Sequence, residues 1–240
     1  MSELGPEATP PRFSVIIPVL NESQALPATL EALRRVPELE IIVVDGGSSD
    51  ATLAIARSLG ACVLAAARGR GGQLHAGAMA AHGDVLWFLH ADTRPQDAPS
   101  AIVAMTLALN DPAVVGGYFR LSFSPHADGR RAAPRLLTWI YPRLRWLGLW
   151  YGDSGMFLRR TTYRSAGGFA PYPLFEDLDL MRRLRRRGRI VLVSETLQTS
   201  SRRFANRGFP LTFAHWTLLQ CLFWLGVSPI RLARHYRPVR

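Results

Sequence analysis

The chain has 240 residues, 48% of them hydrophobic, which suits one α/β domain with a sizeable core and a small C-terminal addition. Its two cysteines, Cys62 and Cys221, give neither a disulfide framework nor a zinc-binding spacing, which favours a reducing, cytoplasmic setting. The formal net charge is +11 and every basic residue is arginine, so Schiff-base catalysis by lysine is excluded.

The first half of the chain is predicted to alternate buried strands with helices. Residues 1–11 are polar and Pro-rich and indicate a disordered lead-in without a signal peptide. The expected strands are Phe13–Val19, Glu40–Val44, Ala61–Ala65 and Val85–Leu89. The expected helices are Gln24–Arg35, Asp50–Leu59, Gly72–Ala81 and Asp97–Leu109, with Asp50 as N-cap and Gly60 just past a helix end. This order predicts a parallel sheet with its ligand site beyond the carboxyl ends of the strands.

The second half differs in charge as well as in pattern. Residues 1–119 contain 7 Arg and 12 acidic residues, a net charge of −5, whereas residues 120–240 contain 22 Arg and 6 acidic residues, a net charge of +16. This basic half suits a phosphate-bearing ligand, an anionic membrane surface or a nucleic acid. The expected elements are a strand at Val114–Phe123, a helix at Arg135–Trp150, a short strand at Gly155–Leu158 and a helix at Glu176–Arg187.

Polar residues follow the first two expected strands. Pro18 is expected to stop the ladder, so that Asn21 and Glu22 face a ligand, although an ordinary strand end is an alternative. Asp45 ends the second strand and can accept hydrogen bonds from a nucleobase or ribose. A plain strand–turn–helix connection capped by Asp50 is the competing interpretation.

Two further segments suggest phosphate and metal chemistry. Arg68-Gly-Arg70-Gly-Gly-Gln73 opens a helix, where free N–H groups and arginines favour an anion, although a glycine-rich loop explains it too. His90-Ala-Asp92 follows an apolar strand, and Asp92 is the preferred oxygen ligand for a divalent metal. His90 could ligate Mn²⁺ or only hydrogen-bond nearby, and a capped turn is the alternative to a metal site.

The later motifs suggest a base and a diphosphate clamp. Glu176 and Asp177 precede an Arg-rich helix, where one carboxylate could act as general base, or both could merely complement the helix dipole. Residues 152–156 could close over a ligand or form a plain turn. Arg202 and Arg203 could bind a diphosphate bidentately or lie on a solvated basic segment.

These motifs, in this order, resemble the family 2 glycosyltransferases of GT-A fold. The matching pieces are Ile17-Pro-Val-Leu-Asn-Glu22, Val44-Asp45-Gly-Gly-Ser-Ser-Asp50, His90-Ala-Asp92 and Glu176-Asp177, over roughly Phe13 to Val193. The variant His90-Ala-Asp92, with Gly-Arg-Gly-Gly-Gln73 before it and Phe-Glu-Asp-Leu-Asp179 after it, is similar to a bacterial subgroup labelled for arsenosugar biosynthesis.

The resemblance implies a UDP- or GDP-linked sugar donor, an inverting displacement and a hydroxyl acceptor. It implies that Asp45 and Glu22 contact the base and ribose, that Asp92 helps to bind Mg²⁺ or Mn²⁺, and that Asp177 removes the acceptor proton. The remaining expected donor-binding residues are Pro18, Asn21, Arg68, Gln73, Ala91, Arg202 and Arg203. The family's usual Asp-x-Asp has His90 in its first place, which leaves the metal and its first ligand open. The Gln-x-x-Arg-Trp motif of processive polymerases is absent, which disfavours a polysaccharide synthase.

These expectations divide the chain into a nucleotide-binding half at residues 12–119, an acceptor half at 120–200 and a basic, apolar helical segment at 201–240. In the last, Leu211–Val227 is 17 residues long and free of formal charge. A helix packed on the domain, an interfacial helix at the inner face of the membrane and a short membrane span are the alternatives. Contact with lipid would suggest a lipid-linked acceptor.

Two other function classes compete with sugar transfer. A nucleotidyltransferase would also place acidic metal ligands on a parallel sheet, but it would normally need more carboxylates and often a lysine. A basic nucleic-acid-binding protein fits the charge, but the sequence contains no recognised binding module. We therefore expect no nucleic-acid partner.

Overall fold

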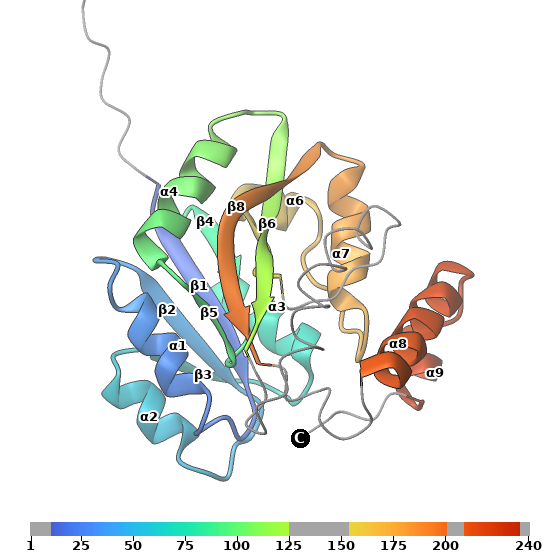
Figure 1. Ribbon diagram of the computed structural model, residues 1–240, viewed down its shortest axis with the longest axis horizontal. Helices are drawn as coiled ribbons and strands as arrows, with labels where there is room; N and C mark the ends of the chain where they lie inside the picture. Colours follow the sequence, from blue (N-terminus) through green and yellow to red (C-terminus); the bar gives the residue numbers. More distant parts are fainter. Residues whose placement is uncertain (1–10, 125–153, 201–208, 236–240) are drawn as a thin grey trace, which may run out of the picture.

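The computed structural model describes residues 11–124, 154–200 and 209–235, with side chains described from Ala214 onward in the last range (Figure 1). Outside these ranges lie residues 1–10 of the predicted lead-in, the predicted helix at residues 135–150, and Arg202 and Arg203.

The strands form one mixed sheet in the order β3-β2-β1-β4-β7-β6-β8-β5. They are β1 (Phe13–Val19), β2 (Glu40–Asp45), β3 (Cys62–Ala65), β4 (Val85–Phe88), β5 (Thr93–Pro95), β6 (Val114–Phe123), β7 (Phe157–Arg159) and β8 (Arg189–Thr199). Strands β1 to β4 are mutually parallel, and β6 pairs in parallel with β8, while β7 runs antiparallel between β4 and β6. The parallel half confirms the predicted α/β architecture.

Helices cover both faces of this sheet (Figure 1). They are α1 (Leu26–Leu33), α2 (Thr52–Ser58), α3 (Arg70–Ala80), α4 (Ala98–Leu109), α6 (Arg160–Ser165), α7 (Glu176–Arg185), α8 (Phe209–Trp224) and α9 (Pro229–Ala233). Side chains alternate between the faces along a strand. Val15 of β1 therefore belongs to one core cluster with Leu30 of α1, and Ile16 belongs to a second with Leu74 of α3 and Leu180 of α7.

Most of the predicted strands and helices of the first half are present with bounds within two residues of those expected, and the missed elements lie mainly in the second half. The observed β1 and β6 have the predicted ends, and Gly60 follows α2 with φ +79° as predicted. Strand β3 is less buried than expected because it lies at the sheet edge. The sequence interpretation missed β5, α6, β8 and α9, although β8 is the partner of β6 along most of its length.

Helix α8 packs on the domain. Leu219 is 3% exposed, and Phe223 lies against Phe175 with ring centroids 5.2 Å apart. In the described part of the chain no helix has the length and apolarity to cross a membrane.

Candidate active site at the carboxyl edge of the sheet

Hydrogen bonds join the loops that follow β1 and β2. Asn21, at φ +55°, donates its backbone N–H to Ser48 Oγ at 2.9 Å and accepts from the Ser49 N–H through Oδ1 at 2.8 Å. The backbone N–H of Glu22 donates to Thr52 Oγ1 at 2.8 Å. The side chain of Asn21 therefore builds the loop, while the half-buried Glu22 lies beside it at the same sheet edge.

Asp45 ends β2 with its side chain held by the following turn. The residue is 5% exposed, and its carboxylate accepts the backbone N–H groups of Gly47 at 3.0 Å and Ser48 at 3.1 Å. These bonds fix both carboxylate oxygens at the end of a buried strand. The Ser48 hydroxyl also donates to Oδ1 at 2.5 Å, so three donors of the turn already occupy most of the about four lone-pair sites of this carboxylate.

Asp50 ties the two loops together. Hydrogen bonds from the Thr52 hydroxyl and from Ser23 hold the pKa of Asp50 well below its ordinary value, so the side chain stays ionised. The helix N-cap is Ala51, one residue later than predicted. The carboxylate of Asp50 still accepts the backbone N–H of Thr52 at 3.0 Å, at the first residue of α2.

Pro18 ends the ladder on one side of β1 only, which corrects the prediction that it stops the ladder. Toward β2 the pairing continues to Val19 opposite Asp45. Toward β4 the last pair is Ile16 with Phe88. Alternate residues of β1 hydrogen-bond to the same neighbouring strand, so Pro18, like Ile16, faces β4. Because Pro18 has no N–H to donate, the hydrogen bonds to β4 end there and the two strands can separate.

Gln73 joins β1 to β2 from the first turn of α3. Its Nε2 donates to the carbonyl oxygen of Val19 at 2.9 Å and to that of Val44 at 2.8 Å, and the residue is 5% exposed. Both amide hydrogens are therefore used within the protein. Gln73 would therefore contribute to donor binding indirectly, by holding the ends of β1 and β2 in place. Arg68, the other residue expected from this motif, is exposed in the loop before α3.

His90, Ala91 and Asp92 form the turn after β4. The backbone N–H of Thr93 bonds to the carbonyl oxygen of His90 at 3.1 Å. Ala91 is buried, and its carbonyl oxygen accepts the hydroxyl of Thr29 at 2.8 Å. This bond anchors the turn to α1, so that half-buried His90 and Asp92 lie on either side of a fixed residue at the carboxyl end of β4.

The donor set of this turn fits a hard divalent cation only in part. Among the described residues, no group of three or more His, Cys, Asp or Glu side chains could hold a metal ion. One carboxylate and one imidazole suffice for Mg²⁺ or Mn²⁺ when a diphosphate and water supply the other ligands. Asp92 and His90 therefore fit a metal that binds together with a phosphate ligand.

Glu176 and Asp177 reach the same edge through an arginine. Arg70, the first residue of α3, places Nε 2.8 Å from Oε1 of Glu176 and Nη2 3.5 Å from Oδ2 of Asp177. The Glu176 side chain is 3% exposed and that of Asp177 is 14% exposed. Helix α3 starts at the carboxyl edge, where Gln73 meets the strand ends, so both acidic motifs share this edge.

A glycine permits this close approach. A Cβ on Gly71 would lie 2.8 Å from the carbonyl oxygen of Ala170 and 3.1 Å from Cβ of Glu176. Any larger residue would push α3 away from the start of α7. The Gly-rich motif therefore brings α3 against an acidic pair, and the arginine expected to hold an anion is instead paired with carboxylates of the protein.

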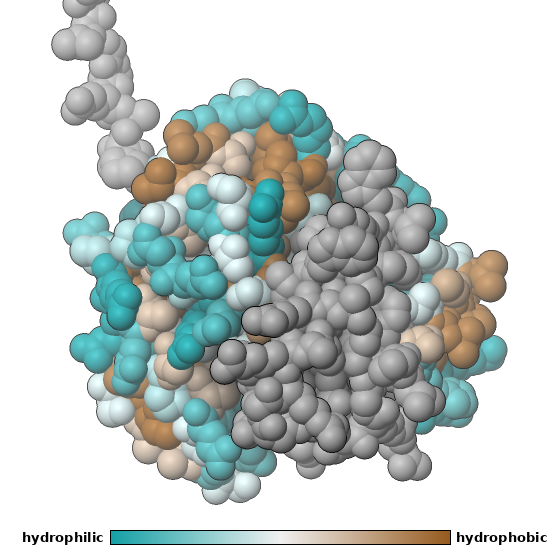
Figure 2. All heavy atoms as spheres, in the orientation of Figure 1, coloured by the Kyte–Doolittle hydropathy of each residue, from teal (hydrophilic) through white to brown (hydrophobic). Residues whose placement is uncertain are grey.

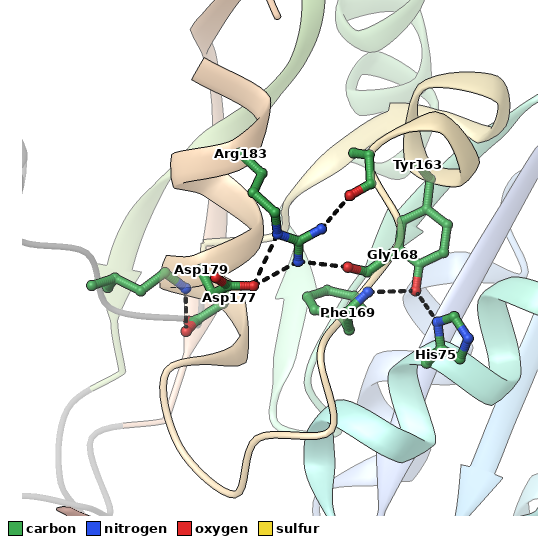
Figure 3. Close-up of polar contacts among 9 residues, drawn as sticks. His75, Tyr163, Gly168, Phe169, Asp177, Asp179 and Arg183 are labelled. Carbon is green, nitrogen blue, oxygen red and sulfur yellow. Dashed lines mark hydrogen bonds and ion pairs between the residues drawn. The ribbon is translucent and has the colours of Figure 1, made fainter. Parts of the chain in front are cut away.

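Side chains behind the acids fix the loop that leads into α7 (Figure 3). Asp179 Oδ2 accepts from Nη2 of Arg183 at 2.7 Å, and that guanidinium also donates to the carbonyl oxygen of Gly168 at 2.6 Å. The hydroxyl of Tyr163 accepts the backbone N–H of Phe169 at 3.0 Å and lies 2.9 Å from Nδ1 of His75. Burial raises the pKa of Tyr163 to about 12, so the phenol is neutral.

The sequence interpretation missed this network. Asp179 and Arg183 are four residues apart on α7, a spacing from which their ion pair could have been predicted. No local pattern marks Tyr163 or His75, because their contact joins two helices distant in sequence. At residues 152–156, the described part is a buried turn in which Ser154 is 5% exposed and its carbonyl oxygen accepts the Phe119 N–H at 2.9 Å.

Comparison with known families gives one match over most of the chain. The model of the family described as Glycosyl transferase family 2 matches residues 14–165. The undecaprenyl-phosphate 4-deoxy-4-formamido-L-arabinose transferase of Serratia proteamaculans (strain 568) is 33% identical over 161 residues, 62% of this chain and 48% of the relative. A PGL/p-HBAD biosynthesis glycosyltransferase of Mycobacterium bovis (strain BCG / Pasteur 1173P2) is 50% identical over 48 residues, 19% of each chain. The matches thus span less than half of either relative.

Solved structures share the fold at low identity. A mannosyltransferase from Pyrobaculum calidifontis, in complex with GDP-Man and Mn²⁺, aligns with a TM-score of 0.65 at 17% identity over 97% of this chain and 66% of its own. Glucosyl-3-phosphoglycerate synthase from Mycobacterium tuberculosis, in complex with Mn²⁺, UDP and glucosyl-3-phosphoglycerate, aligns with a TM-score of 0.58 at 23% identity over 85% of this chain and 75% of its own. These alignments confirm the expected GT-A-like fold.

Proposed function

The chain belongs to glycosyl transferase family 2 and is a glycosyltransferase, and we propose that it transfers a sugar from a UDP- or GDP-linked donor to an acceptor hydroxyl with inversion. One observation carries the proposal. The His90-Ala-Asp92 turn and the Glu176–Asp177 pair, far apart in sequence, lie at the same carboxyl edge of the sheet. Family membership disfavours the nucleotidyltransferase and nucleic-acid alternatives.

The two carboxylates of the pair take different roles in this proposal. Glu176 is buried against Arg70 and holds the start of α3 in place. Asp177 is more exposed, and its Oδ1 accepts the backbone N–H of Leu178 at 2.8 Å, which orients the carboxylate. Asp177 therefore receives the acceptor's hydroxyl proton while the acceptor oxygen bonds to the anomeric carbon and the nucleoside diphosphate leaves.

The donor lies along the strand ends in this proposal. Asp45 and Glu22 contact the base and ribose, and Arg68 provides positive charge at the start of α3 for the diphosphate. Asp92 with His90 would hold Mg²⁺ or Mn²⁺, which neutralises charge on the departing diphosphate when bound. Neighbours of this fold bind GDP-Man with Mn²⁺ or UDP with Mn²⁺, which supports the proposal. Arg202 and Arg203 remain predicted diphosphate contacts outside the described residues.

We propose a lipid-linked acceptor, at the inner face of the cell membrane, because the Serratia relative is named for undecaprenyl phosphate. The similarity to the subgroup labelled for arsenosugar biosynthesis and the division into a nucleotide-binding and an acceptor half stay predictions.

Donor binding and product analysis test the reaction class. The full chain is screened against UDP- and GDP-sugars with Mn²⁺ or Mg²⁺ by thermal shift, since a bound donor raises the unfolding temperature. Turnover with the stabilising donor should release free nucleoside diphosphate. Release of pyrophosphate instead would identify a nucleotidyltransferase and contradict the proposal.

A further inference from the structure

Exposed apolar side chains gather on the hairpin formed by α8 and α9. In the described part of the chain eight large apolar side chains are exposed, and four of them lie between residues 218 and 230. They are Leu218 at 56%, Trp224 at 41%, Leu225 at 81% and Ile230 at 60% exposure. Figure 2 shows this hydrophobic surface over α8 and α9 at the right edge of the molecule. We call these four residues the hairpin tip.

The hairpin has a fixed shape, so its apolar tip is built into the fold. Gly226, at φ +92°, ends α8, with the Val227 N–H bonded to the Leu222 carbonyl and the Gly226 N–H to that of Phe223. The opposite side of the hairpin is anchored, since Leu219 and Leu232 are each 3% exposed. Burial of the inner side leaves Leu225 and Ile230 directed away from the domain.

Charge identifies the partner. Residues 196–240 contain seven arginines and no acidic residue, and Arg231 and Arg234 are exposed on and just after α9, beside the tip. A protein partner would need a purely acidic rim, whereas an anionic bilayer supplies negative charge next to an apolar interior everywhere. Tryptophan at the edge of the tip suits the same boundary.

We propose that the hairpin tip inserts into the surface of an anionic lipid bilayer, with Arg231 and Arg234 against the headgroups. The inserted part comprises side chains and no membrane span. Phe223 of α8 packs on Phe175, the residue before Glu176, so lipid binding would place the acidic pair close to the membrane. This inference rests on the proposed function, because membrane binding would bring the enzyme to a lipid-linked acceptor. The vesicle assay uses neither donor nor acceptor, so its outcome is independent of the test of sugar transfer.

Vesicle flotation of the full chain tests the proposal. We compare phosphatidylcholine vesicles with vesicles that contain about 30% phosphatidylglycerol, and expect strong binding only to the anionic ones, weakened by high salt. L225S/I230S should reduce that binding about tenfold or more, because two apolar contacts are lost. R231Q/R234Q should reduce it as well and flatten the salt dependence.

The matched control is V103S/L107S on α4, where the two side chains are 57% and 65% exposed but distant in sequence from the tip. It should bind vesicles like the wild type, and unfolding curves should show that all variants fold. Equal loss of vesicle binding in L225S/I230S and V103S/L107S overturns the proposal. So does the absence of wild-type binding to anionic vesicles. A concentration-dependent dimer that L225S/I230S abolishes, without vesicle binding, would show instead that a second copy covers the tip.

Discussion

The guanidinium Nε of Arg70 lies 2.8 Å from Oε1 of Glu176, and this ion pair joins the first residue of α3 to the first residue of α7. Glu176 is 2% exposed, and a carboxylate buried so deeply requires a counter-charge. The same arginine reaches Asp177 at 3.5 Å. The position and the charge of Asp177, the proposed base, thus depend on Arg70 of the Gly-rich motif, about a hundred positions earlier in the chain.

Asp177→Asn should abolish sugar transfer while the fold survives. Removal of a general base costs about 100-fold to 10,000-fold in rate, and the amide still fits beside Arg70. Asp179→Asn is the matched control, because it removes an acid from the same first helical turn while its amide oxygen can still accept from Arg183. Each variant should lower the free energy of unfolding by about 0.3–1 kcal/mol through the helix dipole. Rates of product release and urea unfolding are measured for both. Equal activity loss in both variants would favour the dipole role over the base.

Asp92→Ala should remove metal-dependent donor binding. The carboxylate is the one hard oxygen ligand in the turn after β4, so affinity for the donor with Mn²⁺ should fall to that measured with chelator. His90→Ala should change the preference between Mn²⁺ and Mg²⁺ more than it changes the affinity for the donor with Mg²⁺, since imidazole suits the softer ion. Isothermal titration with each metal measures both effects. Wild-type transfer that resists a chelator would contradict the metal role of Asp92.

The buried parallel strands could be predicted from sequence because they are apolar on both faces. Strand β1 is such a run, and its ends agree with the prediction. Strand β8 could not be recognised in the same way, because Ser194 and Glu195 interrupt its apolar residues and several positions are partly exposed. Its stability comes from β6, some 70 residues earlier, through pairing that no local pattern encodes.

At the site, the sequence predicted which residues end strands but not what they contact. Asp45 and Asp92 lie at the carboxyl edge as expected, because the order of strands and helices determines that edge. The partners of Gln73 and Arg70 depend on how α3 approaches the sheet and α7. That approach is set by contacts between distant segments. The sequence therefore predicted that Gln73 contacts the donor and that Arg70 favours an anion, whereas in the structure Gln73 links the ends of β1 and β2 and Arg70 pairs with Glu176.

Gly71→Ala should destabilise the protein and impair catalysis, whereas Gly72→Ala should do neither. A Cβ at position 71 would lie 2.8 Å from the Ala170 carbonyl oxygen, while one at position 72 meets nothing within 4 Å. The clash should cost about 1–3 kcal/mol and shift the start of α7. Because position 72 is an exposed position within a helix, Gly72→Ala should gain about 0.4–1 kcal/mol. Urea unfolding and activity assays are carried out on both variants. Equal stability of the two would contradict the close packing of α3 against Ala170 and the start of α7 at position 71.

Tyr163→Phe should weaken the protein at neutral pH and flatten its loss of stability in alkali. Without the hydroxyl, the buried N–H of Phe169 loses its acceptor, at a cost of about 1–3 kcal/mol. In the folded wild type, burial raises the pKa of Tyr163 from 10.0 to about 12. The folded state therefore binds more protons than the unfolded state between these values, and the free energy of unfolding falls as pH rises from 10.0 toward about 12.

This contribution of Tyr163 is fully present below the unfolded pKa, and a shift of this size corresponds to about 2–3 kcal/mol at most. Urea unfolding at about pH 9 and about pH 11.5 measures the difference in slope between wild type and variant. The other tyrosines titrate in both proteins, so they cancel in the comparison. Phenylalanine cannot ionise, hence the variant should lose less stability over this interval. Equal losses in the two proteins would mean that Tyr163 ionises as readily in the folded state as in the unfolded chain.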